Sequence, residues 1–177
     1  DHGDLTDDYA AIRKEMEAVA AHFGKHVLRE VELETVESHV GELRRACGDR
    51  AVLRALHYYD ENARVLEQAA AIRGGDLPAF FDAVKRSGDS SWKLLQNVYA
   101  RSTEEQMAMG IELSRRFLHG DGAQRVHGGG FAGTIQAYVP LDRLDDYKKL
   151  MEDAFGPGSC TALMVRPEGA VMMPMEG

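Results

Sequence analysis

Residues 125–133 read Arg-Val-His-Gly-Gly-Gly-Phe-Ala-Gly, a glycine-rich stretch that stands directly before an alternating apolar run. Packing does not explain three consecutive glycines, because glycine loses more backbone entropy on folding than any other residue. Glycines permit positive φ angles and close approach of the backbone to a ligand, and successive exposed N–H groups can form an anion-binding concavity. A tight hairpin with a bulge and no ligand is the alternative, and the glycines alone leave both interpretations open.

The residues that follow the glycines predict a small sheet in the last third of the chain. Apolar residues alternate with a period of two over residues 135–139, which is typical of a strand. We expect two further strands at residues 160–165 and 169–173, joined by a turn that contains a proline and a glycine.

The rest of the chain predicts helices. Apolar residues recur every three or four positions in several stretches, and glycines follow most of them. We expect helices over residues 9–23, 33–45, 51–73, 76–86, 103–118 and 141–155. Asp76 can cap the fourth of these, and the serine-rich residues 87–91 indicate a loop or a helix interruption after it. Helices around a small sheet indicate an α+β protein.

Composition excludes several classes of function. The chain has 177 residues, 44% of them hydrophobic, and a net charge of −8, which suits one domain. An acidic surface repels phosphodiester backbones and anionic headgroups, so we expect no nucleic-acid partner and no membrane. Two cysteines, Cys47 and Cys160, fit reduced thiols in a cytoplasmic protein rather than a disulfide framework. The chain opens on Asp1 without a signal peptide, which fits a processed chain or a piece of a longer one.

The glycine-rich stretch resembles the third sequence motif of the GHMP kinases, in the form that galactokinases carry. The matching residues are Arg125, Gly128, Gly129, Gly130, Phe131 and Gly133. Three neighbours depart from the usual pattern: Ala132 stands where the family often has glycine, Thr134 where it often has cysteine, and His127 where it often has threonine.

The resemblance continues along the chain from about residue 2 to residue 171. The pattern His2-x-x-Leu5-x-x-x-x-Tyr9 with Arg13 is similar to the galactokinase segment that enters the C-terminal half, and residues 54–65 are similar to a later stretch. The resemblance implies a GHMP-kinase C-terminal domain over residues 1–177, with residues 1–30 leading from a missing N-terminal domain. It also implies an α+β fold with a ferredoxin-like small antiparallel sheet, packed helices and additional N-terminal helices.

The resemblance further implies an ATP-dependent galactokinase that phosphorylates galactose to galactose 1-phosphate, with Mg²⁺. The family's catalytic groups lie in the N-terminal domain, so we expect no catalytic residue and no metal site in this chain. We also expect no tightly bound cofactor and no activity of the chain alone. Tyr9 matches the tyrosine of the galactose pocket. The active-site glycine loop comprises Gly128, Gly129, Gly130, Phe131 and Gly133, and we expect it near the phosphate path without a chemical role.

Several alternatives remain at this point. The parent protein could be a galactokinase-like sensor that binds sugar and nucleotide without turnover, or a kinase for a related sugar such as N-acetylgalactosamine. An apolar face left by the missing domain would favour self-association. The residues His127 to Gly130 also match the oxyanion-hole signature of some esterases, but the sequence has no Gly-x-Ser-x-Gly elbow. His22 and His26 are four residues apart, but Gly24 between them argues against a metal pair on one helix face.

Overall fold

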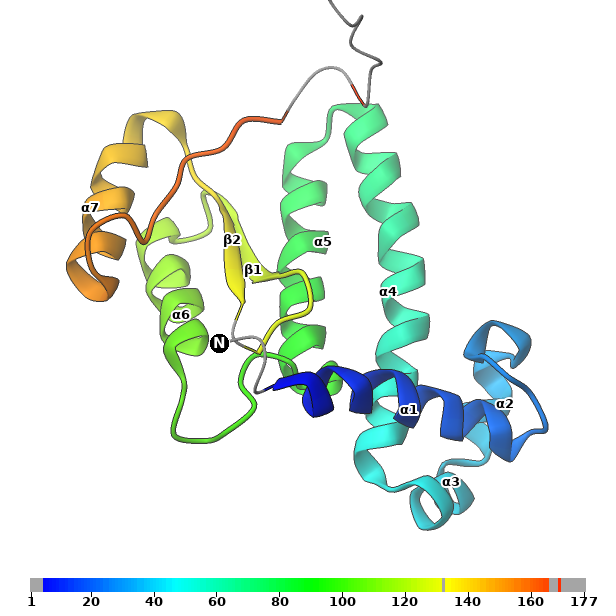
Figure 1. Cartoon of the computed structure of the whole chain (residues 1–177). Helices are drawn as coiled ribbons and strands as arrows, with labels where there is room; N and C mark the ends of the chain where they lie inside the picture. Colours follow the sequence, from blue (N-terminus) through cyan, green and yellow to red (C-terminus); the bar gives the residue numbers. More distant parts are fainter. Residues whose placement is uncertain (1–4, 132, 166–168, 170–177) are drawn as a thin grey trace, which may run out of the picture.

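A computed structural model of the chain describes residues 5–131, 133–165 and 169 (Figure 1). Helices dominate, and two strands pair antiparallel, which confirms the expected α+β class with a small antiparallel sheet. The elements run in the order α1 (Thr6–His22), η2 (Leu28–Glu30), α2 (Leu33–Ser38), α3 (Val40–Cys47), α4 (Asp49–Gly74), α5 (Leu77–Ser90), η3 (Ser91–Leu95), α6 (Gln106–Leu118), β1 (Ala123–His127), β2 (Thr134–Tyr138), η4 (Leu141–Arg143) and α7 (Leu144–Phe155).

The first four α-helices share one hydrophobic core. Helix α1 lies across the lower part of α4, and the short helices α2 and α3 lie beside it (Figure 1). Their apolar side chains bury one another, as the helical spacing in the sequence predicts. The buried members are Val19, Ala20, Leu28, Val31, Val36, Leu43, Ala51, Val52 and Ala55. This core therefore sets the position of α1, which carries Tyr9 on its first turn.

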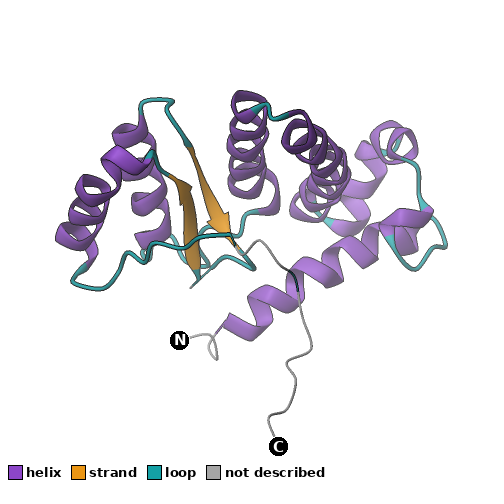
Figure 2. Ribbon diagram, turned by 90° about the horizontal axis from the view of Figure 1, so that it is seen from above, coloured by secondary structure: helices purple, strands orange, loops and turns teal. Residues whose placement is uncertain are grey.

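The sheet lies between α6 and α7 on one side and α5 with α4 on the other (Figure 2). Strand β1 pairs with β2 in a register that places Val126 opposite Ile135. Two helix glycines allow close packing against the strands: an ideal Cβ on Gly88 of α5 would lie 3.1 Å from the Gln124 carbonyl oxygen, and one on Gly110 of α6 would lie 3.1 Å from Ile135 Cδ1. A second core forms here, around Val98, Met107, Ala108 and Val126.

The expected interruption at residues 87–91 is wrong. Helix α5 continues to Ser90, and a single π-type turn, η3, follows it. Asp76 caps the start of α5 as predicted, with its Oδ1 accepting a hydrogen bond of 3.0 Å from the Ala79 amide. Serine favours loops because its hydroxyl competes for backbone partners. Here Ser87 and Ser90 are buried and bond to side chains of α4 instead, so the helix tolerates them.

Two other expectations also change, and a third falls almost wholly outside the described residues. The helix expected over residues 33–45 is two short helices that meet at His39. Residues 160–165 are extended but not paired in a strand, because a strand needs a ladder partner and none of the described residues supplies one. Of the strand expected at residues 169–173, only Gly169 lies within the described part of the chain. Among the described helices, none combines the length and the apolar character that crossing a bilayer requires.

Candidate functional site

The glycine loop connects β1 to β2 at one end of the sheet. Its backbone has positive φ at Gly128 (64°), Gly130 (80°) and Phe131 (57°), and the Gly133 amide donates a hydrogen bond of 3.0 Å to the Gly130 carbonyl. A positive φ costs glycine little, whereas Phe131 adopts it at a cost that its surroundings must offset. Gly128 and Gly129 are exposed, and Gly130 and Phe131 are buried. The loop therefore presents backbone at the surface above a buried anchor.

Tyr9 contacts this loop across 121 residues of sequence. Its hydroxyl donates a hydrogen bond of 2.8 Å to the Gly130 carbonyl oxygen, and its ring packs edge-to-face on Phe131 with the centroids 5.1 Å apart. Gly129 makes room for the ring, since an ideal Cβ there would lie 2.7 Å from Tyr9 Cε1. Tyr9 and the glycine loop, which the sequence analysis singled out separately, form one constellation.

Asn97 holds the loop from the other side, and sequence reasoning missed it. Its Nδ2 donates to the Gly129 carbonyl oxygen at 3.1 Å, and its backbone carbonyl accepts from the Phe131 amide at 2.5 Å. The side chain is 2% exposed. Gln96 precedes it with φ at 58°, which turns the chain out of η3. The available signal was a polar pair, Gln96 and Asn97, inside an otherwise apolar stretch.

A cavity of about 390 Å³ adjoins this constellation at Phe131. Its lining residues are Asp8, Arg50, Arg54, Trp92, Gln96, Val98, Tyr99, Ala100 and Phe131. Arg54 is almost fully buried and donates from Nε to the Leu95 carbonyl at 3.0 Å and from Nη1 to Glu15 at 2.9 Å. Burial lowers the pKa of this guanidinium, and Glu15 counteracts part of that effect. Arg54 thereby ties α4 to α1 and to the chain just before Asn97.

Comparisons with known proteins bear on the family and the fold of this chain. No protein-family model matches the chain. The curated galactokinase of Mannheimia succiniciproducens is 30% identical over 154 residues, and that of Haemophilus influenzae strain KW20 is 31% identical; each alignment covers 87% of this chain and 38% of the relative. A crystal structure of Lactococcus lactis galactokinase in complex with galactose matches with a TM-score of 0.64 at 20% identity, over 85% of this chain and 38% of that one.

Together, these matches support a C-terminal fragment of a galactokinase. The chain corresponds to the C-terminal part of these proteins and spans 38% of the length of the curated relatives it matches. The structural likeness by itself shows the shared fold, and the sequence similarity to curated galactokinases supports the assignment as a galactokinase fragment. The resemblance stated from the glycine motif and from Tyr9 is thereby confirmed at the level of the family.

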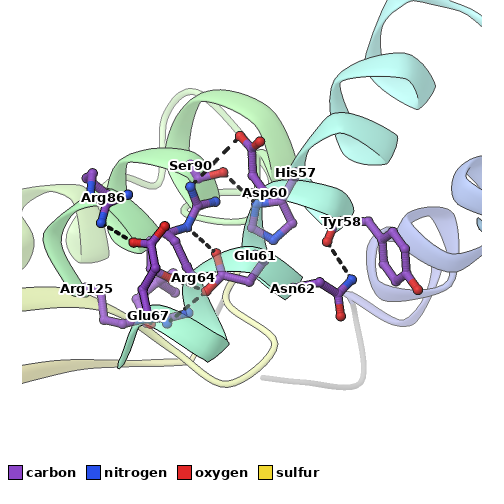
Figure 3. A network of polar contacts seen from close by, with 12 residues as sticks. His57, Tyr58, Asp60, Glu61, Asn62, Arg64, Glu67, Arg86, Ser90 and Arg125 are labelled. Atoms are coloured by element: carbon purple, nitrogen blue, oxygen red, sulfur yellow. Dashed lines mark hydrogen bonds and ion pairs between the residues drawn. The ribbon is translucent and has the colours of Figure 1, made fainter. Parts of the chain in front are cut away.

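A polar network anchors β1, the strand that leads into the glycine loop (Figure 3). Glu61 on α4 accepts a hydrogen bond from Ser87 on α5 and one of 3.1 Å from Arg64 Nε, and Arg125 Nη1 on β1 lies 3.6 Å from its Oε1. Burial acts to raise the pKa of Glu61, but Ser87, Arg64 and Arg125 outweigh it and lower the pKa. The charged carboxylate therefore joins α4, α5 and β1, and it gives Arg125 of the motif a structural role.

His57 belongs to the same interface and predicts a dependence of stability on pH. The ring is 7% exposed, with Nδ1 2.9 Å from Ser90 Oγ, and burial lowers its pKa below the ordinary 6.5. The His57 imidazole therefore takes up a proton more readily in the unfolded chain than in the folded chain. Protonation of His57 does not affect folding above pH 6.5. As the pH falls below 6.5, the free energy of unfolding decreases, with a slope of at most about 1.4 kcal/mol per pH unit.

Urea unfolding at several pH values on both sides of this pKa measures the effect. We expect His57→Gln to remove most of the slope just below the ordinary histidine pKa. Its matched control, His26→Gln, replaces an exposed histidine and should leave the slope in place. A slope unchanged in His57→Gln would contradict the assignment.

Proposed function

We propose that this chain forms one wall of the active-site cleft of an ATP-dependent galactokinase, which converts galactose to galactose 1-phosphate. The hydrogen bond between Tyr9 and the Gly130 carbonyl is the observation that supports the proposal most. It joins the residue that the family resemblance links to the sugar and the loop that the resemblance links to the phosphate path. The Lactococcus lactis relative was solved in complex with galactose, which supports galactose as the sugar of the proposed reaction.

Tyr9 and the loop would act by positioning. A phenol oxygen both donates and accepts, so a tyrosine that donates to a carbonyl can also accept from a sugar hydroxyl, while its ring packs on an apolar face of the sugar. Gly128 and Gly129 are exposed and carry no side chain, so a phosphate group can approach their backbone closely. Phosphoryl transfer depends mainly on such positioning and on charge stabilisation, which suits a wall that contributes no reacting group.

ATP and Mg²⁺ are the nucleotide and metal of the proposed reaction. The described residues contain no group of three or more histidine, cysteine, aspartate or glutamate side chains that could hold a metal ion. When bound, the metal would neutralise charge on the transferred phosphoryl group. We propose that the catalytic groups lie in the part of galactokinases that has no counterpart among these 177 residues, and that the chain alone is inactive.

Exposed apolar side chains are consistent with a covering domain. Leu163, Met164 and Val165 are 90%, 93% and 90% exposed, and they stand in the extended segment after α7. Such a patch favours burial against another part of the protein, which we propose to be the N-terminal domain, or self-association when that domain is missing. The free, half-buried thiols of Cys47 and Cys160 agree with a cytoplasmic enzyme.

A coupled ATP/galactose assay tests the function. It would compare the 177-residue chain with the same chain after any upstream coding sequence is restored. We expect turnover from the longer protein only, and galactose preferred over N-acetylgalactosamine. Turnover by the short chain would contradict the proposed division of the active site. Binding of sugar and nucleotide by the longer protein without turnover would favour a sensor instead.

Tyr9→Phe provides a sharper test within the longer protein. The change removes the hydrogen bond to Gly130 but keeps the ring contact with Phe131, so we expect a stability loss of only about 1 kcal/mol. The KM for galactose should rise about tenfold while the KM for ATP changes little, because one sugar contact is worth about 1.4 kcal/mol. Equal effects on both substrates would show that Tyr9 acts only through the fold. Tyr58→Phe, on α4, is the matched control.

A further inference from the structure

A second cavity, of about 470 Å³, lies away from the glycine loop and has a basic lining. Its lining residues are Lys85, Arg115, Arg116, His119, Gly120, Gly122 and Gln124. Three elements build it: α5 contributes the lysine, the last turn of α6 the arginines, and the start of β1 the glutamine. The glycine loop follows the opposite end of β1, about 16 Å away for five residues of extended chain. Figure 1 shows these two ends of the strand.

The charges around this cavity are unbalanced toward the positive. Glu112 accepts two hydrogen bonds of 2.7 Å from Arg115 and one of 2.6 Å from Arg116, and these bonds lower its pKa to about 2. Lys85 is half-buried and makes no ion pair or hydrogen bond within the described residues. Asp121, next to the cavity, lies 3.7 Å from Arg143 and is balanced by it. One carboxylate therefore offsets three permanently charged basic side chains.

This imbalance stands out in a chain of net charge −8. The acidic remainder of the surface repels anions, so an anion would concentrate where basic side chains converge. Arginine guanidinium groups match the geometry of phosphate oxygens, and lysine binds phosphate as a point charge. The volume falls in the range of small-molecule sites, which indicates a metabolite rather than a macromolecule.

We propose that the cavity between α5, the end of α6 and the start of β1 binds a small phosphorylated metabolite, at a site separate from the Tyr9–glycine-loop constellation. Lys85 and Arg116 carry the phosphate contacts, while Arg115 and Arg116 share the Glu112 carboxylate through hydrogen bonds of 2.7 Å and 2.6 Å. The occupant bridges α5, α6 and β1, and its binding therefore stabilises the sheet from the end opposite to the glycine loop.

Titration of the ¹⁵N-labelled 177-residue chain with inorganic phosphate and with pyrophosphate, at constant ionic strength, tests the proposal. We expect saturable chemical-shift changes at the amides of Gly120, Gly122 and Gln124, with a dissociation constant of about 1 mM for pyrophosphate. Lys85→Gln and Arg116→Gln should each weaken binding about tenfold. Lys25→Gln makes the same change in charge at an exposed lysine outside the cavity, and it should alter binding less than about twofold.

Three results would overturn the proposal. The first is no saturable change at concentrations about tenfold above the expected dissociation constant. The second is an equal loss of binding in Lys25→Gln, which would show a non-specific effect of charge. The third is a response centred on Gly128 and Gly129, which would place the anion at the glycine loop. The ligand-free spectra report whether each variant is folded, and two independent variants keep the test decisive if one is not.

Discussion

Gly130→Ala is expected to lower the free energy of unfolding by about 3 kcal/mol. An ideal Cβ at this position would lie 2.1 Å from the Asn97 carbonyl oxygen and 2.6 Å from its Nδ2. The φ of 80° adds strain for any residue with a side chain. Asn97 has to move, so its bonds to Gly129 and Phe131 are lost together.

Gly128→Ala is the matched control for this prediction. Its φ is also positive, at 64°, but an ideal Cβ there meets nothing within 4 Å. We expect a loss of only about 1 kcal/mol, from backbone strain alone. Urea denaturation measures both variants. Equal losses of stability in the two variants would show that the contacts of Asn97 do not stabilise the loop, contrary to the role assigned to this residue.

Arg54→Ala is expected to cost about 3 kcal/mol of stability, because it removes a buried charge that satisfies two separate groups. The side chain is 2% exposed, and its loss leaves the Leu95 carbonyl without its donor and Glu15 with one arginine fewer. The unsatisfied, half-buried Leu95 carbonyl and the cavity left by the side chain both contribute. The structural consequence should be a looser segment between η3 and Asn97.

Arg50→Ala is the control that distinguishes the effect of losing a buried arginine from the effect of losing a positive charge beside Glu15. Arg50 pairs with the same Glu15, but its side chain is 52% exposed, and we expect it to cost less than about 1 kcal/mol. Thermal unfolding followed by circular dichroism compares the two variants. If Arg50→Ala were as harmful as Arg54→Ala, the charge balance at Glu15 would matter more than the buried anchor, contrary to our explanation.

Local chemistry predicted the elements that depend on neighbours in sequence. The apolar spacing located the main helices, Asp76 capped α5 as expected, and the glycine motif with Tyr9 indicated the family. The same reasoning failed where a residue's partner lies elsewhere. Ser87 and Ser90 indicated a loop in the sequence, but in the structure Glu61 and His57 of α4 are their hydrogen-bond partners. Residues 160–165 have a strand-like pattern, but a strand is defined by its partner.

By itself, the sequence determined the class of fold, the family and two of the site's parts, because periodicity, caps and glycine motifs are local properties. Only the tertiary structure brought Tyr9 to the Gly130 carbonyl, placed Asn97 beneath the loop, and gathered Lys85 with Arg115 and Arg116 around one cavity. The physical reason is that these contacts depend on how α1, α5 and α6 pack against the rest of the domain. Packing is a property of whole helix faces, so residues 121 positions apart can meet without any local signal in either one.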